Sequence, residues 1–258
     1  MSGAPKEPIP AVITAGGLIS GGFASEAGTA IKAMVRIGER TLLEGTIEAL
    51  KESGVVSAVA LVAPGELEGA CEARSADAFI EADHDGVENI RKALTHYSQA
   101  PRVLFCTSDL PFINGAAVRD FVARSPEHAV VTYPVFSKDE IDPAIRPGVP
   151  SYLSLKEGLY TGGSVFCLKV APCLGRIDEI GKAFRARKSP LAMARILGLK
   201  IILKFLLGSC SLDDIVARVE RIMGGACALI RGCDAGITVD IDDLHSYHFA
   251  LEYRKKFP

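Results

Sequence analysis

The sequence has no block of lysines and arginines and no basic stripe interleaved with aromatic residues. With 29 basic and 31 acidic side chains its formal net charge is -2, so we expect no nucleic-acid partner. The seven cysteines are scattered and odd in number, without a CxxC pair. They do not form the pattern of a disulfide framework or a zinc site, and they fit the reduced thiols of a cytoplasmic protein.

The chain also lacks a hydrophobic run long enough to cross a bilayer. Residues 1–10 contain three prolines and no apolar core of a signal peptide, so we expect a flexible N-terminal tail. The strongest apolar segment is residues 197–207, LGLKIILKFLL. It fits a buried core helix, or a subunit contact in a homo-oligomer, better than a helix that lies in a membrane interface.

Short apolar strands alternate with amphipathic helical segments through the first 125 residues. The strands are expected at Val12–Ala15, Val55–Val62, Ala78–Ile80 and Val103–Thr107, and the helices at residues 41–52, 66–74 and 87–97. Parallel strands joined by right-handed crossovers give this order. The sequence therefore predicts an α/β fold in which a Rossmann-like, doubly wound sheet lies between two layers of helices.

Beyond residue 125 the pattern changes. Strands are expected at Ala129–Val135, 152–155, 164–169, Ala226–Ile230 and Ile237–Ile241, with a helical insertion at about 176–223 and a closing helix at Asp243–Lys256. The strands between residues 152 and 169 are close enough in sequence to be antiparallel, which makes the sheet mixed. With 48% hydrophobic residues, we expect residues 11–258 to form a single domain.

One strand runs directly into a carboxylate. Asp109 follows Val103–Thr107, and Pro111 cannot extend the strand ladder, so Asp109 lies at the carboxyl end of a strand. Open α/β sheets bind ligands at this edge, and a buried carboxylate there is costly unless a cation or donors meet it. From this strand alone, a metal site and a cap for a helix beginning near Asn114 are both open.

Three segments in this order resemble the nucleotidyltransferases related to molybdenum-cofactor guanylyltransferases, the MobA-like NTP transferase family. They are residues 13–17 (ITAGG) with 31–35 (IKAMV) and 38–44 (GERTLLE), residues 107–111 (TSDLP), and residues 236–244 (GITVDIDDL). The resemblance covers nearly the whole chain and implies a sheet of the nucleotide-diphospho-sugar transferase type. It also implies transfer of an NMP from an NTP to a phosphorylated or hydroxylated small-molecule acceptor, with release of pyrophosphate.

The resemblance assigns roles to residues of these segments. Ala15, Gly16 and Gly17 would bind the nucleotide, together with the catalytic Lys32. A catalytic Mg²⁺ would be held by Asp109 with Asp240 and Asp242, because Mg²⁺ prefers oxygen ligands and usually takes one or two carboxylates. Asp242 has a second interpretation, as the cap of the closing helix.

The acceptor would bind at two further stretches, residues 159–163 and 187–190, which look like a less characterised branch of the family. Residues 161–163 could form its floor or, equally, a tight hairpin turn. The basic cluster around residue 187 suits an anionic acceptor, and a solvated helix face explains it nearly as well. The expected acceptor-binding residues are Thr161, Gly162, Gly163, Arg187 and Lys188, with Arg185 beside them. His245 and His248 are interpreted as packing residues.

The loop after the first glycines departs from the family pattern. Leu18–Ile31 contains no arginine or lysine, carries Glu26, and is rich in small residues, as if it ordered only on binding. Arg36 or the cluster at Arg185 would have to supply the missing cation. A catalytically degenerate nucleotide-binding or regulatory protein of the same fold is therefore an alternative. A nucleotide-sugar glycosyltransferase is less favoured, because Thr107-Ser108-Asp109 has only one carboxylate of the DxD motif expected there.

Overall fold

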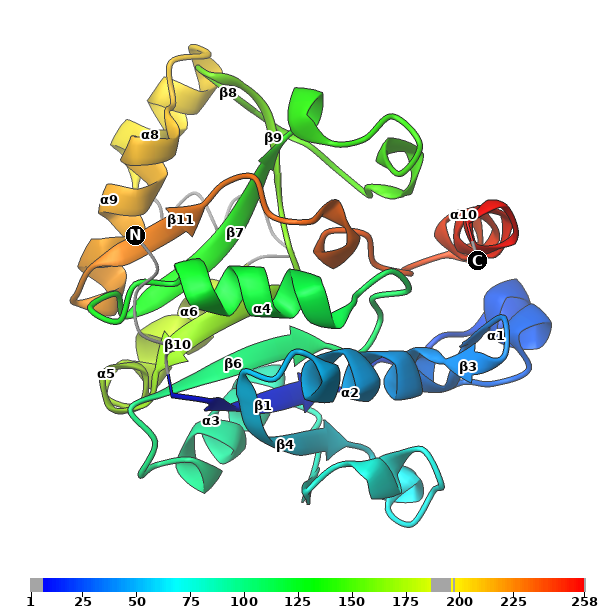
Figure 1. The fold of residues 1–258 in the computed structure, drawn as a ribbon. Coiled ribbons are helices and arrows are strands. Elements are labelled where there is room, and N and C mark those ends of the chain that lie inside the picture. The colour runs from blue at the N-terminus through cyan, green and yellow to red at the C-terminus, as the bar shows by residue number, and fades with distance from the viewer. Residues whose placement is uncertain (1–6, 187–195, 197, 258) are drawn as a thin grey trace.

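The computed structural model describes residues 7–186, 196 and 198–257 (Figure 1). These residues form a nine-stranded mixed sheet with the order β5-β4-β1-β6-β10-β7-β9-β8, in which β11 pairs with β7. The strands are β1 (Ile9–Thr14), β4 (Val56–Ala63), β5 (Ala78–Glu81), β6 (Arg102–Thr107), β7 (Val131–Ser137), β8 (Leu153–Leu155), β9 (Gly158–Gly162), β10 (Val165–Lys169) and β11 (Cys227–Ile230). A two-stranded ribbon, β2 (Arg36–Ile37) and β3 (Arg40–Thr41), stands apart from it.

Helices cover both faces of the sheet. They are α1 (Gly21–Ala27), α2 (Leu42–Glu52), α3 (Gly86–His96), α4 (Gly115–Arg124), α5 (Val170–Leu174), α6 (Ile177–Ala186), α8 (Leu199–Leu206), α9 (Leu212–Met223) and α10 (Leu244–Lys256). Helices α2 and α4 lie on one face (Figure 1), where Leu43, Leu50 and Phe121 belong to one buried core. A second core, containing Leu94 and Ile177, lies under α3, α5 and α6. The predicted three-layer fold with a mixed sheet is confirmed.

The parallel half of the sheet creates the functional edge. Strand β1 pairs in parallel with β4 and with β6, and β4 pairs in parallel with β5. Their carboxyl ends therefore meet at one edge, as the crossover argument predicts. Strand β10 then runs antiparallel between β6 and β7, so the segment that follows Gly162 enters the sheet at the same edge.

The hairpin turn lies earlier than the sequence suggested. Leu155 pairs with Gly158, so the tight turn is at residues 156–157, and Thr161 and Gly162 belong to strand β9. The alternative interpretation of residues 161–163 as a turn is therefore wrong. Their backbone is instead committed to pairing with β7, where Val135 lies opposite Gly162.

Two predicted elements have a different form. Residues 66–74 do not form a helix but two 3₁₀ turns, Gly65–Leu67 and Ala73–Ser75, because Gly69 between them has a left-handed φ of +90° that interrupts a right-handed helix. Residues 237–241 do not form a strand. Ile237 is the last residue of a 3₁₀ turn, Ala235–Ile237, and residues 238–243 run without regular structure to the start of α10.

Two further segments differ from the predictions, one in where it begins and the other in how much of it is buried. Strand β1 begins inside the predicted tail, because Ile9 N donates to Val55 O at 3.0 Å and joins the sheet; residues 1–6 lie outside the described part. In the segment 197–207, Ile201 is buried, whereas Leu206 on α8 is 76% exposed, so most of this helix is not core. No helix among the described residues is long and apolar enough to span a membrane.

Helix α2 begins at a capping box and ends against α4. Thr41 Oγ1 accepts from Glu44 N at 3.1 Å, and Thr41 N donates to Glu44 Oε2 at 2.7 Å. At its other end, Arg119 of α4 donates from Nε to Ser53 O at 2.7 Å. Gly115, the first residue of α4, packs so closely that a Cβ there would lie 3.0 Å from Ser53 N. This contact fixes the chain that leads from Asp109 into α4.

We predict that Gly115→Ala lowers the free energy of unfolding by about 1–3 kcal/mol, because the added methyl group would press on the backbone of α2. The matched control is Gly45→Ala in the interior of α2, where a Cβ meets nothing within 4 Å. This change should stabilise the helix by up to about 1 kcal/mol. Urea unfolding midpoints of both variants would test the packing, and equal midpoints would contradict it.

Candidate active site

Four charged side chains meet at the carboxyl edge of the parallel strands. Lys32 Nζ donates to Asp109 Oδ2 at 2.8 Å and also to Asp242 Oδ1. One carboxylate oxygen from each of Asp109, Asp240 and Asp242 lies within 4.8 Å of the others. The structure thus brings together the four residues that the sequence analysis proposed for catalysis and metal binding. We call these four residues the acidic cluster.

The start of the chain supplies the lysine. Strand β1 ends at Thr14, and Ala15 N donates to Val62 O at 2.8 Å, which holds the turn at the sheet edge. Gly16 and Gly17 follow and are exposed. Lys32 N donates to Gly17 O at 2.9 Å, and a Cβ on Gly17 would lie 3.5 Å from Lys32 Cβ. The predicted nucleotide loop and Lys32, the predicted catalytic lysine, are therefore one packed unit.

The end of the chain supplies two of the three carboxylates. Ile241 N donates to Asp109 O at 3.1 Å, which ties the irregular segment after Ile237 to the end of β6. Gly236 lets this segment approach, since a Cβ there would lie 2.6 Å from Phe112 O. Asp240 therefore reaches the site from a loop rather than from the predicted strand.

Both helix-cap interpretations are wrong, because neighbouring residues do the capping. Asn114 Oδ1 accepts from Ala117 N at 2.9 Å at the start of α4, so Asp109 does not cap that helix. Asp243 Oδ1 accepts from Ser246 N at 2.8 Å at the start of α10. The carboxylates of Asp109 and Asp242 are therefore left to Lys32.

The charges of the acidic cluster are out of balance. Burial alone would lower the pKa of Lys32, but the charges of Asp109 and Asp242 and their hydrogen bonds outweigh it and raise that pKa. Burial, followed by the charges of Asp109 and Asp242, raises the pKa of Asp240 to about 6. One ammonium group therefore does not neutralise three carboxylates, and the remaining negative charge destabilises the ionised form of Asp240.

Two oxygen atoms in the acidic cluster are suited to a metal ion. Asp109 Oδ1 and Asp240 Oδ1 are buried and have no hydrogen-bond partner among the described residues. A buried carboxylate oxygen without a partner is costly, and hard divalent cations bind such oxygens. Asp242 is 60% exposed and Asp109 only 14%, so Asp109 and Asp240 are the better-sheltered ligands.

The predicted acceptor-binding glycines lie next to the loop of Asp240. Gly162 O accepts from Thr238 Oγ1 at 2.6 Å, and Ser164 N donates to Ile237 O at 2.8 Å. A Cβ on Gly163 would lie 2.9 Å from Ile237 O, so this position favours glycine. The end of β9 and the loop of Asp240 thus form one wall of the site.

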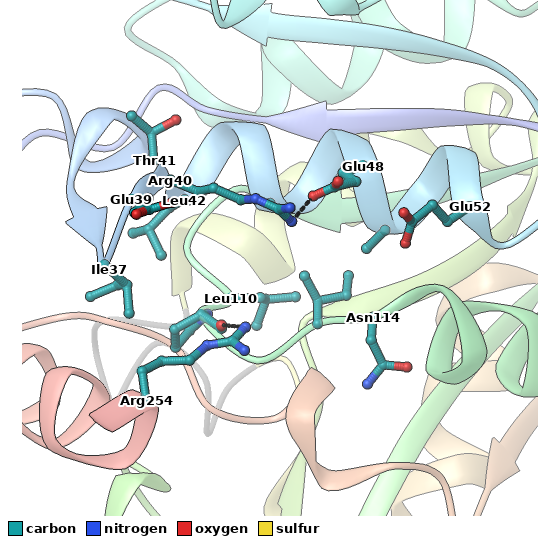
Figure 2. Close-up of a pocket in the computed structure, with 15 residues that line it drawn as sticks. Ile37, Glu39, Arg40, Thr41, Leu42, Glu48, Glu52, Leu110, Asn114 and Arg254 are labelled. Carbon is teal, nitrogen blue, oxygen red and sulfur yellow. Dashed lines mark hydrogen bonds and ion pairs between the residues drawn. The ribbon is translucent and has the colours of Figure 1, made fainter. Parts of the chain in front are cut away.

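A cavity of about 540 Å³ lies between α2, α10 and the chain that follows Asp109 (Figure 2). The acidic cluster does not line it, and its arginines are engaged. Figure 2 shows Arg40 pointing toward Glu48 on α2, and Arg254 Nη2 donates to Pro111 O at 3.0 Å. Arg254 thereby attaches α10 to the chain two residues after Asp109. This contact helps to position the acidic cluster.

Residues 11–166 match the family model of the MobA-like NTP transferase domain. The chain belongs to this family. It is therefore an enzyme of the nucleotidyltransferase class, and the resemblance stated from its motifs is confirmed. No protein of curated function matches the chain.

Solved structures agree with this family and its fold. A hypothetical transferase from Thermus thermophilus is 31% identical, with a TM-score of 0.77 over 91% of this chain and 97% of that one. The 4-diphosphocytidyl-2C-methyl-D-erythritol synthase from Anaerococcus prevotii is 12% identical, with a TM-score of 0.62 over 96% of both chains. Rv0371c from Mycobacterium tuberculosis, in a complex with manganese, is 16% identical, with a TM-score of 0.53 over 95% of this chain and 98% of that one. The two more distant proteins share the nucleotide-diphospho-sugar transferase type of sheet.

The glycine-rich loop of this MobA-like enzyme contains a short helix that packs against α10. Residues 21–27 form helix α1, whose Phe23 is buried against Tyr247 of α10 with ring centroids 5.5 Å apart. Glu26 Oε1 contacts His248 Nε2 at 2.5 Å. His248 is therefore a partner of this loop rather than the packing residue that the sequence suggested.

The cations proposed to compensate for this loop are engaged elsewhere. Arg185 Nη2 donates to Asp85 Oδ2 at 2.7 Å, where Asp85 caps α3, so Arg185 joins α6 to α3. Arg36 Nη2 donates to Glu39 O at 2.8 Å. Arg187 and Lys188 lie outside the described residues. Within the described ranges, Lys32 is the cation paired with the aspartates of the acidic cluster.

The structure adds two site residues that the sequence analysis did not propose. Thr107 Oγ1, at the end of β6, is buried without a partner among the described residues. Tyr133 of β7 lies against Gly162, and burial, followed by the charge of Asp240, raises the pKa of its phenol. Thr107 stands in the motif TSDLP, whereas Tyr133 lies within an ordinary strand pattern that gives no functional signal.

We predict that Lys32→Met lowers the melting temperature of the metal-free protein and increases the additional stabilisation by Mn²⁺ or Mg²⁺. Removing the ammonium group leaves the three carboxylates to repel one another, and a divalent cation then relieves a larger repulsion. Thermal unfolding with increasing metal would measure both effects. Lys51→Met, on the exposed side of α2, is the matched control and should leave the metal response unchanged. A Lys32→Met protein with the metal response of the wild type would refute the charge balance described above.

Proposed function

We propose that this enzyme is a Mg²⁺-dependent nucleotidyltransferase that transfers an NMP from an NTP to a phosphorylated or hydroxylated small-molecule acceptor. The supporting observation is the acidic cluster, in which Lys32 pairs with two of three aspartates beside the Gly16-Gly17 turn. The site takes residues from both ends of the chain, which supports our inference that residues 11–258 act as a single domain.

The residues of the site would divide the work of binding. The exposed turn at Gly16 and Gly17 offers backbone amides to the nucleotide, because no side chain obstructs its approach. Asp109 and Asp240 would hold Mg²⁺, with the more exposed Asp242 assisting. When bound, Mg²⁺ supplies positive charge to the phosphate oxygens. Lys32 supplies a second, fixed positive charge at the same place.

The reaction requires one bond to form and one to break. An oxygen of the acceptor bonds to the α-phosphorus of the NTP, and the bond from that phosphorus to the bridging oxygen breaks, so that pyrophosphate leaves with the bonding electrons. A phosphate acceptor attacks with an oxygen that is already ionised, and a hydroxyl acceptor loses its proton to solvent. The protein contributes alignment and charge, which dominate catalysis of phosphoryl transfer.

Proteins of similar fold guide the choice of nucleotide and metal. A CMP-2-keto-3-deoxy-manno-octonic acid synthetase was solved with CTP, and a 2-C-methyl-D-erythritol 4-phosphate cytidylyltransferase is known from Thermus thermophilus. Rv0371c was solved with manganese. We therefore place CTP first among the NTPs to be tested, with Mg²⁺ and Mn²⁺ as metals.

A catalytically degenerate, nucleotide-binding or regulatory protein is the second candidate. It is favoured by the loop Leu18–Ile31, which has no basic residue, and by the engagement of Arg36 and Arg185 with other partners. Such a protein would bind NTP with Mg²⁺ but would not release pyrophosphate. Turnover therefore separates the two candidates.

We predict that pyrophosphate release falls by about 100- to 1000-fold in Lys32→Ala, the loss typical of one preorganised charge or donor. Asp109→Asn should lose activity at least as strongly, and also the thermal shift that depends on Mg²⁺ and NTP together. The assay would combine ATP, CTP, GTP and UTP, each with and without Mg²⁺, with a panel of phosphate and alcohol acceptors.

Asp120→Asn is the control for these variants, because Asp120 pairs with Arg124 on α4 and makes no contact with the acidic cluster. It should retain wild-type rates. Full activity in Asp109→Asn would rule out the proposed metal site, and NTP binding without turnover for every acceptor would favour the degenerate alternative.

A further inference from the structure

A second cavity, of about 450 Å³, lies between helix α9 and the strands β7, β9 and β11. Its helical wall consists of Leu212, Ile215, Val216 and Val219, whose spacing places them on one face of α9. The sheet contributes Val131 and Leu229 opposite them. No charged residue lines it in the described part of the chain, and its volume is that of a small-molecule site.

This apolar cavity is continuous with the wall of the active site. Thr161 and Gly162 line it, and Gly162 O accepts from Thr238 Oγ1, two residues before Asp240. Tyr133 also lines it, and its ring and hydroxyl lie against Gly162. The hydroxyl group of Tyr133 thus lies at the side of the cavity where Gly162 meets the loop of Asp240.

The lining selects the chemistry of what can enter. A sugar ring placed here would lose its hydrogen bonds to water and find few partners on the walls of α9 and β11, which is costly for each hydroxyl group. An apolar chain would instead gain free energy in proportion to the surface that it buries. The polar end of the cavity suits only the head of such a molecule.

We propose that the acceptor is amphiphilic: a phosphate or hydroxyl head lies beside Asp240, and an apolar body, such as an alkyl or isoprenoid chain, fills the cavity under α9. This inference rests on the proposed function and names its acceptor class. It does not use the basic cluster around residue 187, of which Arg185 pairs with Asp85 and Arg187 and Lys188 lie outside the described residues.

The main alternative occupant of the cavity is a second copy of the chain that would pack on the neighbouring helix α8. Leu199, Leu203 and Leu206 of α8 and the following Leu207 are exposed, while Ile201 of α8 packs with Leu155 and Leu212 near the cavity. A second copy of the chain could cover this face and close the cavity. The direct link from Gly162 to the loop of Asp240 favours a substrate, because a subunit contact has no need of a polar end that leads to the acidic cluster.

The experiment uses butyl, hexyl, octyl and decyl phosphate as acceptors, with glucose 1-phosphate as the polar comparison. Dissociation constants would be measured by calorimetry, and pyrophosphate release in the presence of Mg²⁺ and the NTP that binds best. The alkyl phosphates should bind about fourfold more tightly for each added methylene group until the cavity is full. The alkyl phosphates should also cause release of pyrophosphate from the NTP, whereas glucose 1-phosphate should not.

Two substitutions at one position provide the matched test. Val216→Phe narrows the cavity and should weaken decyl phosphate about tenfold or more, with little effect on butyl phosphate. Val216→Ala widens it and should move the plateau to a longer chain. Both variants should keep the thermal shift produced by NTP with Mg²⁺, which shows that the fold and the acidic cluster are intact.

Affinity that does not depend on chain length, or turnover of glucose 1-phosphate in preference to the alkyl phosphates, would overturn the inference. The inference would also be overturned if the protein formed a dimer and Leu206→Ser both dissociated it and allowed alkyl phosphates to bind. The natural occupant of the cavity would then be a second copy of the chain. Chain-length-dependent binding without any NTP binding would instead overturn the proposed function and leave the apolar site standing.

Discussion

The repulsion among Asp109, Asp240 and Asp242 is the constraint on which the rest of the site depends. Three carboxylates within 4.8 Å of one another, two of them with buried oxygens, separate unless something holds them. Lys32 neutralises part of this charge, and the backbone holds the rest of the geometry through Ile241 N and Asp109 O. The close approach at Gly236 and the grip of Arg254 on Pro111 serve the same end.

Local sequence patterns predicted the parts of the fold that depend on local chemistry. The helix at residues 41–52, the parallel strands and the strand end at Asp109 follow from hydrophobic periodicity and the effect of proline, and they are present as expected. The segment 237–241 has the alternating pattern of a strand but forms single hydrogen bonds to Gly162, Ser164 and Asp109, which lie far away in the sequence, instead of a strand ladder. Periodicity carries no information about such partners.

The candidate site shows the same division. The motifs supplied Lys32, Asp109, Asp240 and Asp242, but they could not decide whether Asp109 and Asp242 were caps, since an aspartate shortly before a helix is compatible with both roles. Only the three-dimensional structure shows that Asn114 and Asp243 do the capping. Tyr133 could not be predicted, because its position is defined by Gly162 on another strand.

The two sides of the site differ in polarity. On one side the acidic cluster collects charge and calls for a hydrated or metal-bound ligand, and on the other the lining of α9 and β11 excludes polar groups. Strand β9 lies at this boundary, since Gly162 contacts the loop of Asp240 and also lines the apolar cavity. Such a boundary suits the proposed reaction between a charged donor and an amphiphilic acceptor.

The double pairing of Lys32 has a consequence for how ligands influence one another. While its ammonium group is shared between Asp109 and Asp242, it competes with any cation for their oxygens. A ligand whose phosphates attract Lys32 therefore makes the carboxylates more available to metal, and metal makes the lysine more available to phosphates. By thermodynamic linkage the two affinities must rise by the same factor. The ion pair thus couples the two binding events in addition to any direct attraction between metal and phosphate.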